Sequence, residues 1–103
     1  MRYNVYLGVK MPREYNRVIA PRIMYVLEVN NKVGMRFSEI FRALAKNGWI
    51  LNQSPIVQNL KFLVKQGKVV HIGNQYALIQ TRENGTKFAI VKDPVERTVE
   101  LGK

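Results

Sequence analysis

The clearest pattern of apolar and polar positions lies in residues 52–66, where apolar side chains recur every three or four residues. They are Ile56, Leu60, Leu63 and Val64. This spacing predicts a helix with one apolar face. Asn52 and Ser54 can each cap its start, and Pro55 suits the first turn, where a missing N–H is not needed. Gly67 follows the last turn, where helices commonly end in the left-handed conformation.

Two more helices are predicted before this one. The first covers about residues 20–30, starts at Pro21 and buries Ile23, Val26 and Leu27. Residues 13–20 are either an irregular basic loop or a helical lead-in. The second begins with Ser38 as its N-cap. Its apolar positions are Ile40, Phe41, Leu44 and Ala45.

Strand patterns precede and follow these helices. Residues 2–11 alternate apolar and polar side chains, which predicts an N-terminal strand or arm within residues 1–12. Residues 33–36 are a short extended segment. Gly73-Asn74 suits the two-residue turn of a β-hairpin that pairs His71 with Tyr76.

The C-terminal part is less clearly patterned. Asn84-Gly85 is a second hairpin signal, after which residues 86–92 are either another strand or a short helix. Residues 94–103 are interpreted as a charged, frayed tail. The chain is therefore read as a single domain, with a core at about residues 20–80.

The chain is strongly basic, with 17 Lys and Arg, 7 Asp and Glu, and a formal net charge of +10. No acidic residue lies between Glu39 and Glu83, so the charge is concentrated on the part that contains the third predicted helix. A small domain with this balance is typical of proteins that bind a polyanion.

The order of these elements resembles the winged helix-turn-helix family over about residues 20–80. The passage from the third helix into the hairpin carries the family pattern Leu-x-x-Leu-x-x-x-Gly-x-Val at Leu60, Leu63, Gly67 and Val69. The resemblance implies an α+β fold with a three-helix core, a β-hairpin wing and an additional N-terminal or C-terminal strand. Size and basicity are similar to those of small winged-helix proteins of archaea and their viruses. Two departures are a long apolar link at residues 48–53 and a wing tip without Lys or Arg.

The resemblance implies sequence-preferring binding of double-stranded DNA by a transcriptional regulator, with helix 52–66 in the major groove. The base contacts would come from Gln53, Ser54, Val57 and Gln58, since Gln pairs well with adenine and Val can pack on a thymine methyl. The phosphate contacts would come from Arg42, Lys46, Lys61, Lys65, Lys68, Gln75 and Arg82. We also expect a homodimer, built by the N-terminal strand or the first helix, and a cytoplasmic, nucleoid-associated location.

Two other binding functions stay open. The apolar connector Trp49-Ile50-Leu51 would suit a protein–protein interaction module, although Trp49 is read as a core residue. Binding of RNA or single strands could use aromatic stacking. The candidates for stacking are Tyr3, Tyr6, Tyr15, Tyr25 and Trp49, which are scattered along the chain.

Enzymatic activity is not expected. The sequence holds one His and no Cys, and it has neither a glycine-rich phosphate loop nor carboxylates paired at a useful spacing. Glu96 and Glu100 are four residues apart but fall in the predicted tail. No metal, cofactor or small-molecule ligand is indicated, and no apolar run reaches the roughly 18 residues of a membrane span.

Overall fold

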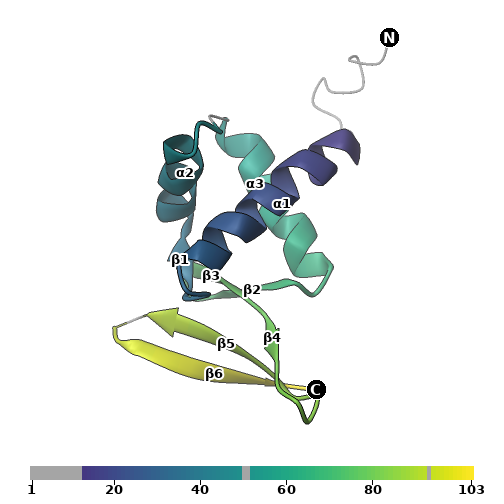
Figure 1. Cartoon of the computed structure of the whole chain (residues 1–103), viewed down its shortest axis with the longest axis vertical. Coiled ribbons are helices and arrows are strands. Elements are labelled where there is room, and N and C mark those ends of the chain that lie inside the picture. The colour runs from purple at the N-terminus through teal and green to yellow at the C-terminus, as the bar shows by residue number, and fades with distance from the viewer. Residues whose placement is uncertain (1–12, 50–51, 93) are drawn as a thin grey trace.

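The computed structural model describes residues 13–49, 52–92 and 94–103, with side chains from Val18 onward. Within these residues three helices pack at one end of the molecule and antiparallel strands lie at the other (Figure 1). The helices are α1 (Arg13–Val29), α2 (Phe37–Lys46) and α3 (Gln53–Lys65). The fold is therefore α+β, as predicted. The predicted strand at residues 2–11 and the connector residues Ile50 and Leu51 lie outside the described residues.

The described strands form two three-stranded sheets. The first has the order β1–β3–β2 and consists of β1 (Met35–Arg36), β2 (Val69–Ile72) and β3 (Gln75–Leu78). The second has the order β4–β5–β6 and consists of β4 (Gln80–Thr81), β5 (Lys87–Lys92) and β6 (Glu96–Gly102). A parallel bridge between Val33 and Ile90 connects the chain segment before β1 to the second sheet.

Helix α1 is longer than predicted, because it begins at Arg13 and continues to Val29. The ambiguous residues 13–20 are therefore helical, and Pro21 lies inside the helix instead of at its start. Proline removes one backbone N–H from the helical ladder. The helix continues through it because Ile19 and Ala20, just before the proline, are buried in the core.

The start of α2 also differs from the prediction, by two residues. Arg36, not Ser38, occupies the N-cap position, and the helix begins at Phe37. The carboxylate of Glu39 accepts a hydrogen bond from the backbone N–H of Arg36 at 2.8 Å. A side chain from inside the first turn thus replaces the hydroxyl cap that the sequence suggested.

The main core lies between the three helices and one face of the first sheet. Its fully buried members include Ile23, Leu27, Ile40, Leu44, Ile56 and Leu60. Val64, predicted to belong to this core, is 39 % exposed, whereas Asn59 is fully buried. The reason is geometric: α3 buries positions 56, 59, 60 and 63, and residue 64 lies at the edge of that stripe.

The hairpin after α3 is confirmed, with His71 paired to Tyr76 and a turn in which Gly73 has a φ of 61°. Val69 and Leu78 face the helical core. The opposite face of the hairpin packs against β5 and β6 in a second cluster, which contains Val70, Ile72, Ala77, Ala89, Val91, Val99 and Leu101. The hairpin is thus packed on both faces, and its turn projects from the sheet.

The C-terminal residues do not form a frayed tail. Residues 87–92 are a strand, which settles the choice between strand and helix, and Glu96–Gly102 form β6, which pairs antiparallel along the whole of β5. Val99 and Leu101 of β6 pack into the second cluster. Val99 and Leu101 are the only apolar residues within β6, so the sequence pattern predicts this strand weakly. Pairing with β5 stabilises β6 instead.

Candidate nucleic-acid interface

One face of α3 presents a row of polar and basic side chains to solvent. Ser54, Gln58, Lys61 and Lys65 are all exposed and follow one another at intervals of four, three and four residues. These intervals place them on one side of the helix. At 1.5 Å per residue the row is about 16 Å long. Its N-terminal half carries neutral hydrogen-bonding groups, and its C-terminal half carries two ammonium groups.

The core fixes the orientation of this row. Ile56, Leu60 and Leu63 on the opposite face of α3 are at most 2 % exposed. Turning α3 to hide Lys61 and Lys65 would expose these side chains, at a cost of about 1.5–3 kcal/mol each. The row therefore stays open because the apolar face cannot leave the core.

Three more residues of α3 flank the row. Val57 is half-buried and Val64 is 39 % exposed, and the two lie seven residues apart on the same side of the row. Gln53 is exposed in the first turn but is rotated from the row by roughly 110°, at 100° per residue. The sequence pattern placed Val64 in the core and not among the base-contacting residues. Its seven-residue spacing from Val57 would have indicated that the two share one side of the helix.

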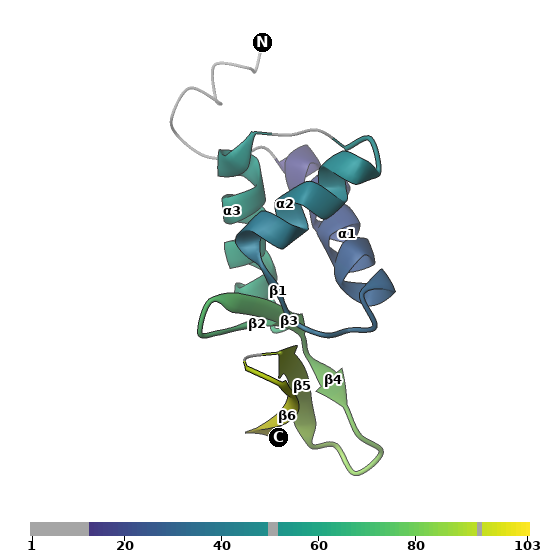
Figure 2. The same cartoon turned by 90° about the vertical axis from the view of Figure 1, so that its left-hand side faces the viewer.

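The basic residues predicted on α2 form a separate pair. Arg42 and Lys46 are exposed and one turn apart. Together with Glu39, Ala43 and Ala45 they line a shallow hollow of about 620 Å³. In Figure 2 α2 crosses the front of the helical layer, with α3 to its left. The hollow beside Arg42 and Lys46 is lined by residues of α2 alone, so this basic pair is separate from the row on α3.

The turn of the β2–β3 hairpin lies on the same side of the molecule as α3 (Figure 2). Gly73 and Asn74 are exposed there. His71 is also exposed, and its ring stacks on that of Tyr76 with centroids 4.1 Å apart. Lys68 lies elsewhere, in a hollow of about 390 Å³ between α1 and α3.

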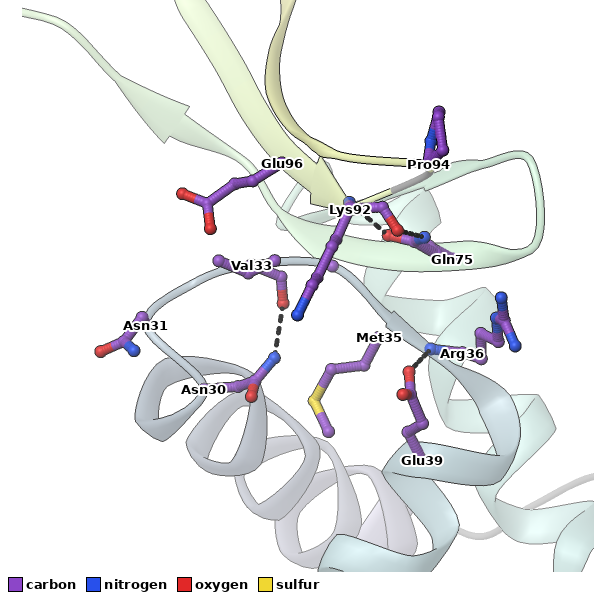
Figure 3. A pocket seen from close by; sticks show the side chains of 11 residues that line it. Asn30, Asn31, Val33, Met35, Arg36, Glu39, Gln75, Lys92, Pro94 and Glu96 are labelled. Atoms are coloured by element: carbon purple, nitrogen blue, oxygen red, sulfur yellow. Dashed lines mark hydrogen bonds between the residues drawn. The ribbon is translucent and has the colours of Figure 1, made fainter.

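Gln75 cannot contact phosphate as predicted, because it is only 3 % exposed. Its side-chain amide points away from solvent and binds the backbone of Lys92 (Figure 3). In a strand, successive side chains face opposite sides of the sheet. Gln75 shares a face with Ala77, which packs in the second cluster, so its position in the hairpin directs it into the interior.

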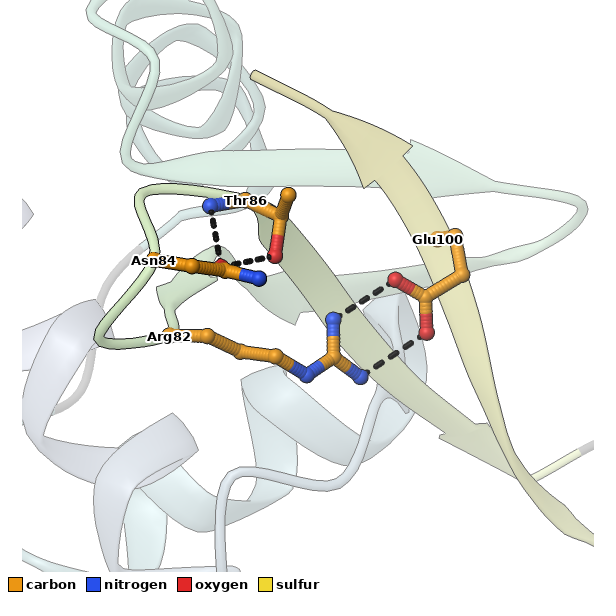
Figure 4. Close-up of polar contacts among 4 residues, drawn as sticks. All are labelled: Arg82, Asn84, Thr86 and Glu100. Carbon is orange, nitrogen blue, oxygen red and sulfur yellow. Dashed lines mark hydrogen bonds and ion pairs between the residues drawn. The ribbon is translucent and has the colours of Figure 1, made fainter.

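Arg82 is engaged by a carboxylate of its own chain. Its two terminal nitrogens donate to the two carboxylate oxygens of Glu100 at 2.6 and 2.8 Å (Figure 4). The guanidinium also lies 4.3 Å from the centre of the Phe88 ring. The hydrogen bonds with Glu100 raise the pKa of Arg82 and lower the pKa of the Glu100 carboxyl. Arg82 therefore serves the second sheet and is not a free cation for phosphate.

A cleft of about 430 Å³ is lined by the α1–β1 turn, the start of α2 and the ends of β5 and β6 (Figure 3). Its polar groups are largely occupied by one another. Asn30 donates to the carbonyl of Val33 at 3.0 Å, and Glu39 caps α2. The remaining charges, which include Arg36, Lys92 and Glu96, are of both signs. This cleft does not share the uniform positive charge of α3.

No protein-family model, curated protein or solved structure matches the chain. Across the described residues, no helix is long and apolar enough to cross a membrane. In the same part of the chain, no three His, Cys, Asp or Glu side chains come together as a metal site would require.

Proposed function

We propose that the protein binds double-stranded DNA with α3 in the major groove, and that it does so as a transcriptional regulator with a winged helix-turn-helix fold. The observation that carries the proposal is the exposed row Ser54, Gln58, Lys61 and Lys65. Its polar half suits base edges and its basic half suits phosphates.

The connectivity supports the winged-helix arrangement. A short strand, β1, lies between α1 and α2, and the hairpin that follows α3 pairs with it through β3. The hairpin turn and α3 lie on one side of the molecule, where a duplex could meet both (Figure 2). The hairpin turn carries no Lys or Arg, so α3 would supply most of the electrostatic attraction to the DNA phosphates.

The electrostatics support a polyanionic partner. No acidic residue lies between Glu39 and Glu83, so the whole of α3 is free of carboxylates. The first turn of α3 holds no acidic side chain, and the partial positive charge of the helix N-terminus is therefore not neutralised there. A major groove about 12 Å wide accepts one helix.

The roles along α3 follow from this orientation. Ser54 and Gln58 would meet base edges, and Val57 with Val64 would offer apolar contact to thymine methyl groups. Lys61 and Lys65 would bind phosphates and set affinity and register. The basic pair on α2, Arg42 and Lys46, would add phosphate contacts beside the groove.

The salt dependence of binding to a random duplex tests the electrostatic part. If about six phosphates are neutralised, log affinity should fall against log salt with a slope of about −5. The double variant Lys61→Gln with Lys65→Gln should make that slope shallower by about 2. The matched control, Lys87→Gln with Lys103→Gln, removes the same charge from exposed positions outside the helices. An equal loss in both variants would indicate attraction by net charge alone and would contradict the proposed interface.

Selection of bound duplexes from a random pool tests sequence preference. An enriched motif is expected, and Gln58→Ala should relax it at one position while leaving the salt slope unchanged. Tighter binding to single strands or RNA than to duplexes would replace the major-groove proposal with one of stacking on aromatic side chains.

A further inference from the structure

The outer face of α1 is apolar and exposed. Val18, Tyr25 and Val29 are 46 %, 48 % and 59 % exposed, whereas Ile23 and Leu27 on the inner face are fully buried. Five large hydrophobic side chains are exposed among the described residues, and three of them belong to this face of α1. The other two are Val64 and Val95. An apolar stripe on a surface helix is typical of a contact with another chain.

The stripe has the spacing of a helix–helix seam. With Arg22, which is half-buried, the positions are 18, 22, 25 and 29, at intervals of four, three and four residues. This is the alternation of a and d positions at which two helices pack side by side. We name these four residues the α1 seam.

We propose that the α1 seam pairs with the α1 seam of a second copy of this chain, with the two helices antiparallel. In an antiparallel pair the four positions of one helix match the same four positions of the other. Val18 would lie opposite the partner's Val29, and Arg22 would lie opposite the partner's Tyr25. A parallel pair in register would instead set Arg22 against the partner's Arg22. Two guanidinium groups facing each other in an apolar seam would repel.

The arrangement of Arg22 supports the antiparallel direction. Its guanidinium lies 5.1 Å from the centre of the Trp49 ring, and the same ring meets Tyr25 edge to face at 5.7 Å. Arg22 and Tyr25 are thus held together against Trp49 at the middle of the seam. A second tyrosine ring, from the partner, would give the guanidinium another aromatic contact.

Pairing through α1 would leave the proposed DNA-binding surface open. Helices α1 and α3 lie on opposite sides of the helical layer (Figure 2). A dimer joined by the two α1 seams would therefore leave both α3 rows uncovered, and each could hold a separate duplex. This last consequence rests on the proposed function, whereas the pairing itself does not.

Sedimentation equilibrium of the full chain tests the pairing and its direction. Wild type should self-associate, and Val18→Glu with Val29→Glu should weaken association by at least roughly tenfold, because like charges would face each other. Val18→Lys with Val29→Lys should do the same, which excludes an effect of net charge. Val18→Glu with Val29→Lys should restore the dimer, since each Glu would then face the partner's Lys. Weak association of this last variant would contradict the antiparallel direction.

The control variant is Val95→Glu, which changes a valine that is 66 % exposed at a distance from α1 in the sequence. It should dimerise like wild type. Circular dichroism checks that each variant is folded. A wild-type chain that stays monomeric up to its solubility limit would overturn the proposal, as would a dimer that survives Val18→Glu with Val29→Glu. Retained DNA binding by that monomeric variant would leave the proposed function standing.

Discussion

The side-chain amide of Gln75 binds the backbone of Lys92 through both of its polar atoms. Nε2 of Gln75 donates to the carbonyl of Lys92 at 2.7 Å, and the backbone N–H of Lys92 donates to Oε1 at 3.0 Å. The amide thus acts as an additional peptide group at the end of β5. Since β3 belongs to the sheet that contacts the helices, this pair of bonds connects the helical part to the second sheet.

Replacing Gln75 with Ala should lower the free energy of unfolding by about 1–3 kcal/mol, because two backbone groups of Lys92 lose their partners at a partly buried site. Urea denaturation measures the change. Gln58→Ala makes the same truncation on the exposed face of α3 and should change the free energy of unfolding by less than about 0.5 kcal/mol. Equal effects of the two substitutions would show that the amide of Gln75 does not hold the sheets together.

Gly34 should be coupled to Gln75. A Cβ at position 34 would lie 2.7 Å from Oε1 of Gln75, closer than atoms of this kind can approach. Gly34→Ala should therefore destabilise the wild-type fold, and the loss should be smaller when Gln75 is already Ala. The remaining loss reflects the Cβ of residue 75 at 3.3 Å. A double-mutant cycle measures this coupling, and additive effects would contradict it.

The sequence predicted those elements whose stabilising contacts are local or periodic. The apolar stripe of α3 and the turn at Gly73-Asn74 could be predicted, because helical spacing and turn formation both depend on residues that are close in the sequence. Strand β6 was not recognised, because its stability comes from pairing with β5 and from a few contacts of Val99 and Leu101. Long-range pairing of this kind leaves little trace in local composition.

The candidate site shows the same division. Periodicity placed Gln58, Lys61 and Lys65 on the exposed face of α3, where they lie. It could not show that Gln75 turns inward to Lys92, or that Arg82 is bound by Glu100, since both depend on residues about 17 or 18 positions away. A polar or basic residue type therefore did not by itself show that a side chain is free to contact phosphate.

Glu100 should make stability depend on pH. Its hydrogen bonds from Arg82 lower the pKa of its carboxyl in the folded chain. The contribution of the pair is therefore present above the unfolded-state pKa and is lost as the pH falls through the folded-state pKa. Glu100→Gln should be less stable than wild type near pH 7. The difference should be smaller near about pH 3, below the ordinary glutamate pKa. Urea midpoints at both pH values measure this.

The control for that experiment is Glu96→Gln on the same strand, since Glu96 forms no ion pair with another described residue. The difference in urea midpoint between Glu96→Gln and wild type should be about the same at the two pH values. If Glu100→Gln and wild type differ equally at both, the ion pair does not stabilise the fold in solution.

A chain that pairs through α1 and binds DNA through α3 should hold two duplexes together, because each copy in the dimer would keep its own α3 row open. Capture of a fluorescent duplex by a second, immobilised duplex measures this bridging. Wild type and Val18→Glu with Val29→Lys should bridge, whereas Val18→Glu with Val29→Glu should bind single duplexes without bridging them. Lys61→Gln with Lys65→Gln should dimerise but capture little DNA. Bridging by the Val18→Glu, Val29→Glu variant at wild-type levels would mean that another surface joins the copies, and the exposed edge of β6 would then be the next to substitute.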